Sequence, residues 1–261
     1  RGLGDVYKRQ VISKCQIDEV RTIEFDHVQF GYDDNLLMKD VNIDVHQGQT
    51  IAIVGPTGAG KTTIVKLLMR FYELNAGTIY IDGHNITDYT RSGLRNMVGM
   101  VLQDAWLFEG SILENLRFGR PNATDEEVMK AAKAAHVDHF IRTLDYGYDT
   151  VLNEASSNIS QGQRQLLTIA RAFLADPKIL ILDEATSSVD TRTEVLIQKG
   201  MDELMKGRTS FVIAHRLSTI RDADNIIVMD HGDIVEVGSH DELMKRNGFY
   251  TKLYNAQFEE A

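Results

Sequence analysis

The chain has 261 residues, of which 43% are hydrophobic and 25% are charged, and this composition excludes an intrinsically disordered protein. A chain of this length buries a large apolar core, and its single cysteine, Cys15, excludes an internal disulfide framework. The formal net charge of −10 opposes binding to nucleic acid, and no apolar run reaches the roughly 18 residues that span a bilayer.

The first 21 residues show no regular pattern, and the stretch 1–10 lacks the apolar centre of a signal peptide. We therefore expect residues 1–21 to be a linker or a segment foreign to the fold, in a fragment of a longer protein. From Thr22 to Phe30, and again from Val41 to Val45, apolar and polar residues alternate on either side of the turn residues 31–35. This alternation predicts a β-hairpin at the start of the domain.

Strand and helix signals alternate in the rest of the chain. Residues 50–54 form an apolar run, a glycine-rich loop follows, and the next helix has an apolar face made of Ile64, Leu67, Leu68 and Phe71. Short apolar strands are predicted at 78–81, 97–102, 179–182, 210–214 and 225–229, with a helical insertion at about 104–175. This order predicts an α/β fold with a parallel sheet.

Two capping signals and a turn refine the pattern. Thr124 and Ser239 are each followed three positions later by a glutamate, Glu127 or Glu242, which is the capping box found at helix starts. Residues 231–233 (HGD) predict a hairpin turn after the strand 225–229.

Residues 55–63 (GPTGAGKTT) match the pattern GxxxxGK[ST] and lie between the apolar strand and the amphipathic helix. A phosphate needs backbone N–H groups at close range, which glycines permit and a helix N-terminus provides. In such a loop the ammonium of Lys61 reaches the β- and γ-phosphates, and the hydroxyl of Thr62 binds Mg²⁺. The pattern predicts a nucleotide-binding P-loop, and the plain alternative is a glycine-rich turn without a ligand.

The apolar strand 179–182 ends in two adjacent carboxylates, Asp183 and Glu184. Taken alone, such a pair is usually a solvated strand end. Beside a P-loop, the better interpretation places Asp183 in the outer shell of Mg²⁺ and Glu184 where it polarises the water that attacks the γ-phosphate.

Residues 159–163 (ISQGQ) resemble LSGGQ, the signature of ATP-binding cassette (ABC) ATPases, although Ile159 and Gln161 depart from it. Other family motifs occur in order. Tyr32 is similar to the aromatic residue that stacks on adenine, Gln103 to the Q-loop, 187–190 to the D-loop and His215 to the switch histidine. The resemblance covers about residues 22–255, and we place the nucleotide-binding domain at 22–258.

The resemblance implies a P-loop NTPase core with a parallel sheet, an N-terminal antiparallel β subdomain and an α-helical insertion, with ATP and Mg²⁺ as ligands. It implies catalytic roles for Glu184, His215 and Gln103. The implied contacts to Mg²⁺ come from Thr62, Gln103 and Asp183. The implied contacts to ATP come from Tyr32, Gly55, Thr57, Gly58, Ala59, Gly60, Lys61, Thr62, Thr63, Ser160, Gly162 and Gln163.

The segments 106–116 and 214–219 resemble ATPase domains of multidrug exporters. In such exporters a membrane domain precedes the ATPase domain on the same polypeptide. Two ATPase domains bind ATP head to tail, with the P-loop of one facing the signature of the other. The resemblance thus implies an ATPase at the cytoplasmic face of the membrane that powers export. Its partners would be a membrane domain, contacted near 103–108, and a second copy or a paralogue, with no nucleic acid.

Two other functions fit the same motifs. A soluble ABC ATPase that acts on ribosomes or chromosomes is disfavoured by the charge of −10, and a regulatory subunit that binds ATP without turnover is disfavoured by Glu184. The segment 153–157 lacks the glycine and acid arrangement usual in exporters, so no coupling role is assigned to Glu154.

Several residues have plain structural alternatives. Tyr32 also suits a hairpin aromatic that packs on the sheet, Gln103 a strand cap, and His215 a structural histidine. By their spacing, three apolar residues are expected to serve packing and not a functional site: Trp106, Met201 and Met205.

Overall fold

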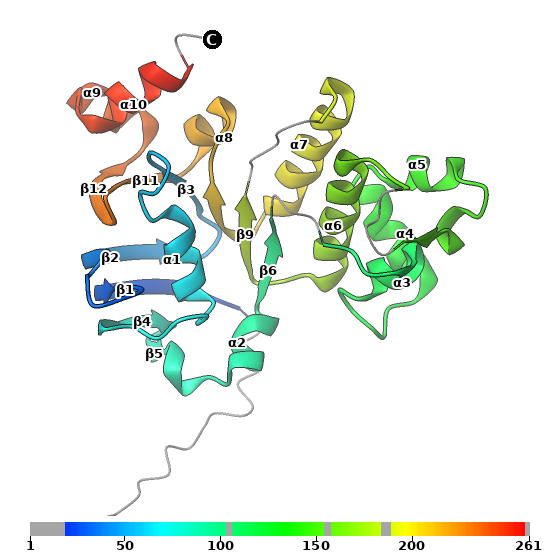
Figure 1. The fold of residues 1–261 in the computed structure, drawn as a ribbon, viewed down its shortest axis with the longest axis horizontal. Coiled ribbons are helices and arrows are strands. Elements are labelled where there is room, and N and C mark those ends of the chain that lie inside the picture. Colours follow the sequence, from blue (N-terminus) through cyan, green and yellow to red (C-terminus); the bar gives the residue numbers. More distant parts are fainter. Residues whose placement is uncertain (1–18, 103–105, 154–157, 184–188, 259–261) are drawn as a thin grey trace, which may run out of the picture.

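The structure is a computed structural model that describes residues 19–102, 106–153, 158–183 and 189–258. Figure 1 shows two lobes, one built around β-sheets and one built from helices, which meet near the strands β6 and β9. Gln103, Glu154 and Glu184 lie outside the described residues, as does the segment 187–188 of the D-loop motif.

A mixed sheet forms the centre of the first lobe. Strands β11, β3, β10, β9 and β6 run parallel in that order, and β12 pairs antiparallel with β11. The predicted parallel sheet and the hairpin at 231–233 are therefore confirmed. The strands are β3 (Thr50–Val54), β6 (Val98–Val101), β9 (Ile179–Asp183), β10 (Thr209–Ile213), β11 (Asn225–Asp230) and β12 (Asp233–Gly238).

Alternate residues of the parallel strands face two different cores. In β9, Leu180 and Leu182 belong to a core shared with the helical lobe, whereas Ile179 and Ile181 belong to a core shared with the second sheet. Because both faces of the sheet are covered, these strands are apolar throughout instead of alternating with polar residues.

The second sheet is antiparallel and has the strand order β2–β1–β4–β5 among the described residues. Its strands are β1 (Thr22–Phe30), β2 (Met38–His46), β4 (Ala76–Ile81) and β5 (His84–Asn85). β1 pairs with both β2 and β4, which confirms the predicted N-terminal hairpin. The buried side chains of this sheet pack in the same core as helix α1 (Lys61–Leu68).

Helix α1 buries Ile64, Leu67 and Leu68, as the sequence predicts. The prediction that Phe71 continues this face is wrong. Arg70 has a left-handed backbone (φ 52°) just beyond the end of α1, and Phe71 is 46% exposed, with the guanidinium of Arg95 4.7 Å from its ring centre. The change of chain direction turns this aromatic ring outward.

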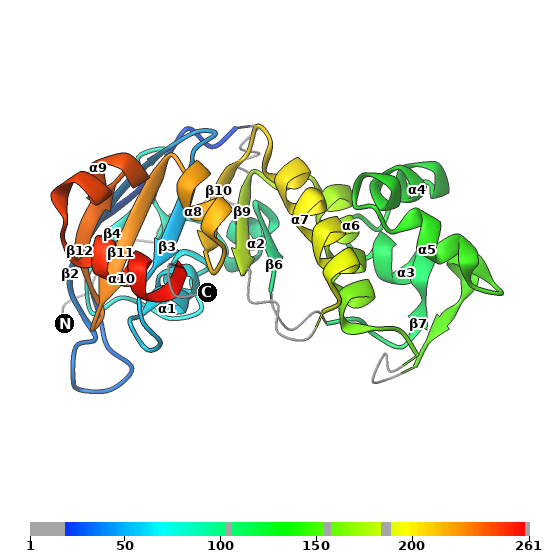
Figure 2. The same cartoon turned by 90° about the horizontal axis from the view of Figure 1, so that it is seen from above.

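The described helices between β6 and β9 form the second lobe, which Figure 2 shows from above. They are α3 (Ile112–Arg117), α4 (Asp125–Ala134), α5 (Asp138–Thr143) and α6 (Gln161–Ala175). The predicted capping box of Thr124 and Glu127 starts α4. Helix α6 packs against α3, α4 and α7 (Thr191–Met205), and a short pairing of β7 (Gly110–Ser111) with β8 (Val151–Leu152) lies beside them.

The remaining elements complete the sheet lobe. The capping box of Ser239 and Glu242 starts α9, as predicted. No helix in the described part of the chain combines the length and apolar character needed to cross a membrane. The elements are α2 (Arg91–Asn96), α8 (Leu217–Asp222), α9 (His240–Arg246), α10 (Phe249–Phe258) and the 3-10 turn Ile86–Asp88, whereas the 3-10 turn Gly147–Asp149 contacts α3 and α5 in the helical lobe.

Trp106 packs against other rings at the surface and not in the core. Met201 is buried and Met205 packs against the core as expected, but Trp106 is 63% exposed. Its ring lies 6.1 Å from that of Phe108 and 6.3 Å from that of Phe118, which is itself 59% exposed. These three rings pack on one another at the surface of the helical lobe, and we refer to Trp106, Phe108 and Phe118 as the aromatic patch.

Candidate active site

The glycine-rich loop joins β3 to α1 and passes close to β11. Gly55 has φ 153°, and a Cβ at this position would lie 2.3 Å from the carbonyl oxygen of Met229, so no side chain fits there. Gly60 precedes α1 in a left-handed conformation (φ 100°) that glycine adopts at little cost. The two glycines thus fix a tight path from the strand to the helix.

The start of α1 has no side-chain cap. The loop residues Thr57 and Gly58 are exposed, whereas Ala59 is buried. An uncapped helix start presents N–H donors and the positive end of the helix dipole. Such a terminus next to an exposed glycine-rich loop suits a phosphate group.

Lys61 lies over the loop from the first position of α1. Its Nζ donates hydrogen bonds to the carbonyl oxygens of Gly55 (2.6 Å) and Pro56 (3.0 Å). Burial lowers the pKa of the Lys61 ammonium, and the carboxylate of Asp183 opposes that shift. A partly desolvated ammonium forms strong, charge-assisted hydrogen bonds to phosphate oxygens.

Asp183 and His215 lie at the same edge of the parallel sheet. Asp183 ends β9 and pairs with Ile213, the last residue of β10, and His215 follows two positions later. Burial lowers the pKa of the His215 imidazole, while the charge of Asp183 raises it and that of Lys61 lowers it. The structure therefore brings Lys61, Asp183 and His215 within electrostatic reach of one another.

The two threonines after Lys61 have different surroundings. Thr62 is exposed, and Thr63 is 6% exposed with its Oγ1 3.0 Å from the hydroxyl oxygen of Tyr32. The Tyr32 ring is 53% exposed and lies edge-on to Phe30 and Tyr72, at 4.9 Å and 5.1 Å between ring centres. This contact fixes an exposed aromatic ring beside the first turn of α1, where a nucleotide base can stack on it.

The oxygen atoms near Lys61 suit Mg²⁺ bound together with a nucleotide. Mg²⁺ prefers hard oxygen ligands and usually takes only one or two from the protein beside phosphate oxygens. Thr62 and the half-buried Asp183 offer such oxygens. Within the described ranges, no group of three or more His, Cys, Asp or Glu residues could hold a metal ion.

The residues of the signature-like segment are organised around the start of α6. Ser160 Oγ accepts a hydrogen bond from Gln163 N–H (3.2 Å), and Gln163 Oε1 accepts one from Ser160 N–H (2.8 Å). Gly162 is buried, and a Cβ there would lie 2.5 Å from Thr193 Cγ2 and 2.8 Å from Val189 Cγ1. Ser160 and Gln163 therefore form a capping box, and Gly162 permits close packing between α6 and the segment that leads into α7.

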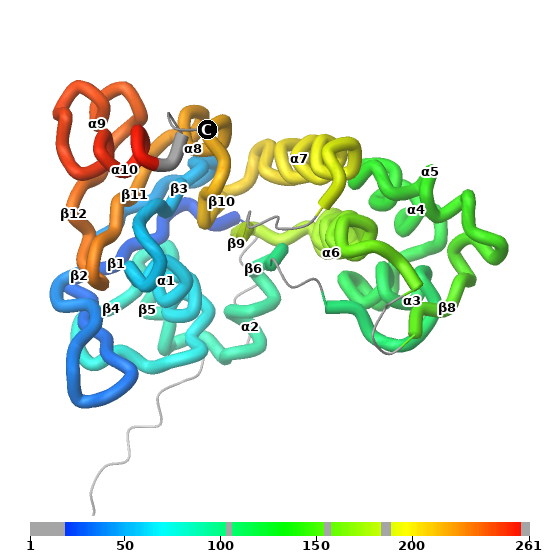
Figure 3. Tube along the Cα trace, turned by 45° about the horizontal axis from the view of Figure 1, so that its top comes forward, coloured from blue at the N-terminus to red at the C-terminus, as the bar shows by residue number. Residues whose placement is uncertain are grey.

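The sequence-predicted site residues that the structure describes fall into two groups. Tyr32, the loop 55–63, Asp183 and His215 gather in the sheet lobe, and Ser160, Gly162 and Gln163 lie at the start of α6 in the helical lobe. Figures 1 and 3 show α1 and α6 on opposite sides of the β6–β9 edge of the sheet. One chain does not bring the two groups together.

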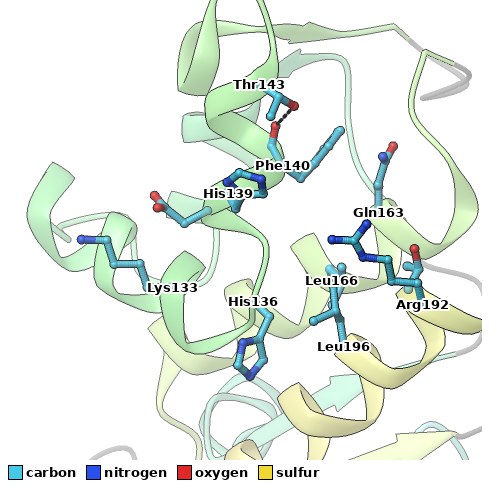
Figure 4. A pocket seen from close by; sticks show the side chains of 11 residues that line it. Lys133, His136, His139, Phe140, Thr143, Gln163, Leu166, Arg192 and Leu196 are labelled. Atoms are coloured by element: carbon cyan, nitrogen blue, oxygen red, sulfur yellow. Dashed lines mark hydrogen bonds between the residues drawn. The ribbon is translucent and has the colours of Figure 1, made fainter.

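A cavity of about 650 Å³ lies among α4, α5, α6 and α7, in the lobe that does not carry the glycine-rich loop. Figure 4 shows Gln163 and Arg192 together on one side of the cavity, with His136 and His139 on other sides of it. Leu166 and Leu196 lie close together. The cavity meets the signature segment only through Gln163, so it is separate from the phosphate site.

Two structural features of the site have no local signal in the sequence. Tyr72 lies edge-on to Tyr32, although it follows α1 and Tyr32 precedes β2. Arg171 of α6 donates a hydrogen bond to the carbonyl oxygen of Trp106 (3.0 Å). Only the folded chain reveals these contacts, because their partners are 40 or more positions apart.

Comparison with known proteins agrees with this geometry. The sequence profile of the family described as ABC transporter matches residues 38–187. A fatty acid ABC transporter ATP-binding/permease protein of Mycobacterium bovis is 57% identical over 90% of this chain, and the match covers 37% of that protein. The ABC transporter ATP-binding protein YfiC of Bacillus subtilis is also 57% identical, over 91% of this chain and 40% of its own length.

A solved structure of a bacterial Atm1-family ABC exporter with ATP bound has a TM-score of 0.85 and 44% identity to this chain. The match covers 92% of this chain and 42% of that one. The chain thus spans about two fifths of the length of these relatives. The P-loop, the strand that ends in Asp183 and the capped signature helix occur in the fold of an exporter ATPase, and the chain belongs to the ABC transporter family as its ATP-binding domain.

Proposed function

We propose that this chain hydrolyses ATP to ADP and phosphate as one of a pair of ATPase domains, and that the reaction powers export across a membrane. The observation that carries the proposal is the separation of the P-loop from the signature. Each lobe holds half of an ATP site, so a second ATPase domain supplies the half that faces each P-loop. Bound ATP then joins the two domains, and hydrolysis releases them.

Each group near the P-loop has a role in this proposal. The start of α1 and Lys61 hold the phosphates, and Tyr32 stacks on the base. Thr62, Asp183 and Gln103 would hold Mg²⁺, which supplies positive charge that offsets the charge of the phosphates. Glu184 polarises the attacking water, and His215 senses the γ-phosphate.

The signature half acts on the nucleotide of the other domain. Ser160 is exposed at the start of α6, so its hydroxyl is accessible to a neighbouring domain. The capping box with Gln163 holds this helix start in shape before any ligand arrives. Ser160, together with the backbone near Gly162, thus presents a preformed surface to the partner's γ-phosphate.

The aromatic patch supports a membrane-domain partner. Large aromatic side chains that are 63% and 59% exposed, at Trp106 and Phe118, are typical of an interaction surface. Trp106, the first residue of the patch, lies three positions after Gln103, and relatives of this chain are ATP-binding/permease proteins. We therefore place the domain at the cytoplasmic face of a membrane, with its membrane partner contacting Trp106, Phe108 and Phe118.

Replacing Glu184 tests the proposal. Glu184→Gln retains the contacts to phosphate and loses the carboxylate that polarises water, so turnover falls by a factor of about 100 or more. The variant accumulates as an ATP-bound dimer, which gel filtration with and without ATP detects. The matched control is Glu203→Gln on α7, whose carboxylate pairs with Lys206 at the surface.

Hydrolysis by Glu184→Gln at the parent rate would show that this carboxylate does not activate water. If the variant loses turnover but elutes as a monomer with ATP, the two-domain proposal is wrong. Glu203→Gln is expected to retain turnover and to respond to ATP as the parent does, so it shows whether either result is specific to Glu184.

A further inference from the structure

The guanidinium of Arg171 joins three separate segments of the helical lobe. Its Nε donates to the carbonyl oxygen of Asn115 (3.0 Å), its Nη2 to Asn115 Oδ1 (3.2 Å) and its Nη1 to the carbonyl oxygen of Trp106 (3.0 Å). Its central carbon lies 5.3 Å from the ring centre of Phe118. One side chain of α6 thus holds α3 and the start of the aromatic patch.

Arg171 makes these contacts as a cation without a carboxylate. Burial alone lowers the pKa of its guanidinium to about 10, which leaves it charged at neutral pH. In the described part of the chain, no ion pair joins Arg171 to an acidic residue. Placing a charge in this position is costly unless its hydrogen bonds are well satisfied, so the bonds to Asn115 and Trp106 are needed to keep it there.

Asn115 fixes the same segment from the other side. It is fully buried, its Oδ1 accepts from Phe108 N–H (3.0 Å), and its Nδ2 donates to the carbonyl oxygens of Phe108 (2.9 Å) and Ser111 (3.1 Å). Residues 106–108 are therefore bonded at Trp106 by Arg171 and at Phe108 by Asn115.

Helices α3 and α6 also approach each other closely at this point. A Cβ at Gly119, just past α3, would lie 2.4 Å from the carbonyl oxygen of Arg171. Helix α6 runs without interruption from Gln161 to Ala175, with Ser160 as its cap. The hydrogen bonds and the close packing therefore leave little room for the aromatic patch to shift relative to α6.

We propose that Arg171 and Asn115 are positioning residues that make the aromatic patch and the start of α6 move as one body. A partner that contacts Trp106 and Phe118 would thereby set the position of Ser160. The inference rests on the proposed function, because it assigns the residues through which the membrane side of the domain communicates with the ATP of the second domain.

Lysine does not replace arginine here. The planar guanidinium directs its N–H groups to two carbonyl oxygens and the amide oxygen of Asn115 and lies over an aromatic ring, whereas an ammonium is a point donor. Arg171→Lys therefore keeps the charge and loses most of the bonding. The matched control is Arg142→Lys on α5, whose guanidinium pairs with Asp138 four positions away on the same helix.

The test uses Trp106, the single tryptophan of the chain, as a fluorescent reporter on the patch. In Glu184→Gln, addition of ATP is expected to change Trp106 emission as the dimer closes on Ser160. In Glu184→Gln/Arg171→Lys the dimer still forms, since the P-loop and Ser160 are intact, but the change in emission is lost. Glu184→Gln/Arg142→Lys retains the full response.

Hydrogen exchange shows whether Arg171→Lys acts locally. The exchange rate of the amides at residues 106–111 is expected to rise by about tenfold, because that is the effect of losing one charge-assisted hydrogen bond. The exchange rates in β3 and α1 are expected to stay unchanged. A rise across the whole chain would mean that Arg171 only stabilises the fold, and this would overturn the inference. If Arg171→Lys does not fold, Phe118→Leu serves as the second variant, because it removes the ring next to the guanidinium and weakens the same response.

The outcomes separate the two proposals. If Glu184→Gln forms no dimer with ATP, the proposed function fails and the inference fails with it. If the dimer forms but Trp106 does not respond, or responds equally in the Arg171→Lys background, only the inference is overturned.

Discussion

The two halves of the proposed ATP site are two helix starts that are built in opposite ways. Helix α1 follows Gly60 and has no side-chain cap, whereas α6 follows Ser160, whose side chain and that of Gln163 cap each other. No side chain caps the first turn of α1, which leaves room for a ligand there, whereas Gln163 N–H in the first turn of α6 donates to Ser160 Oγ of the same chain. In the proposed function, α1 is the helix start that binds phosphate, and α6 is the helix start whose cap holds its shape before the nucleotide of a second domain contacts it.

The largest expected effect comes from removing the cation at the uncapped start. Lys61→Met is expected to weaken ATP binding by about 100-fold, because a partly desolvated, charge-assisted contact to the phosphates is lost. Equilibrium titration with ATP measures this change. Lys66→Met, in the last turn of the same helix, is the matched control and keeps the parent Kd.

Unchanged ATP affinity in Lys61→Met would contradict the assignment of α1 as the phosphate-binding start. A loss of affinity that Lys66→Met shares would point to a general effect on the helix.

The capped start is tested by adding bulk to it. Ser160→Arg is expected to leave ATP binding by its own P-loop unchanged, and to lower ATP-dependent dimerisation and turnover by about tenfold or more because the side chain obstructs the partner's phosphates. The substitution also removes a cap worth about 1 kcal/mol. Ser239→Arg removes the equivalent cap of α9 and is the control for that loss.

Mixing Ser160→Arg with Lys61→Met sharpens the same comparison. A mixed dimer has one site with an intact P-loop and an intact signature, and a second site that contains both lesions. Turnover above that of either variant alone supports binding across the two domains. No recovery would mean that the two sites are strictly coupled or that the arrangement across domains is wrong.

A smaller effect is expected from the glycine inside the capped start. Gly162→Ala places a methyl group 2.5 Å from Thr193 Cγ2 and 2.8 Å from Val189 Cγ1. Both neighbours are stiff, β-branched side chains, so the strain exceeds the gain in helix propensity and stability falls by about 1–3 kcal/mol. Urea unfolding measures the difference.

Gly200→Ala in α7 is the matched control for Gly162→Ala. Its nearest neighbour is Ile169 Cγ2 at 3.4 Å, which is ordinary contact. Without strain, the gain in helix propensity dominates and stability rises by up to about 1 kcal/mol. Equal changes in stability would show that the packing of α6 against Val189 and Thr193 does not require a glycine at position 162.

The smallest effect concerns the contact of Tyr32 with α1. Tyr32→Phe removes the hydroxyl that lies 3.0 Å from Thr63 Oγ1, and it costs about 0.5–1.5 kcal/mol of stability while ATP affinity stays close to that of the parent. Tyr32→Leu removes the ring as well and weakens ATP binding. Equal ATP affinity in the two variants would show that the ring of Tyr32 does not stack on the base.

The local sequence determined much of this protein. The apolar runs of β3, β9, β10 and β11, the hairpin turn at 231–233 and the capping boxes at Thr124 and Ser239 were predictable, since each depends on residues a few positions apart. The P-loop was predictable for the same reason: nine consecutive residues, 55–63, specify the turn and the helix start together.

Only the tertiary structure decided how these pieces meet. Phe71 and Trp106 have the apolar character of core residues, yet a backbone turn and a surface ring cluster keep them exposed. Gly162 fits a phosphate-binding signature in sequence, and in the fold it is buried against Thr193.

The contact of Arg171 with Trp106 and the distribution of the site over two lobes likewise depend on packing between distant segments. The periodicity and spacing of a sequence record which face of an element is buried. They do not record which other element covers that face, because that choice depends on the whole packed chain.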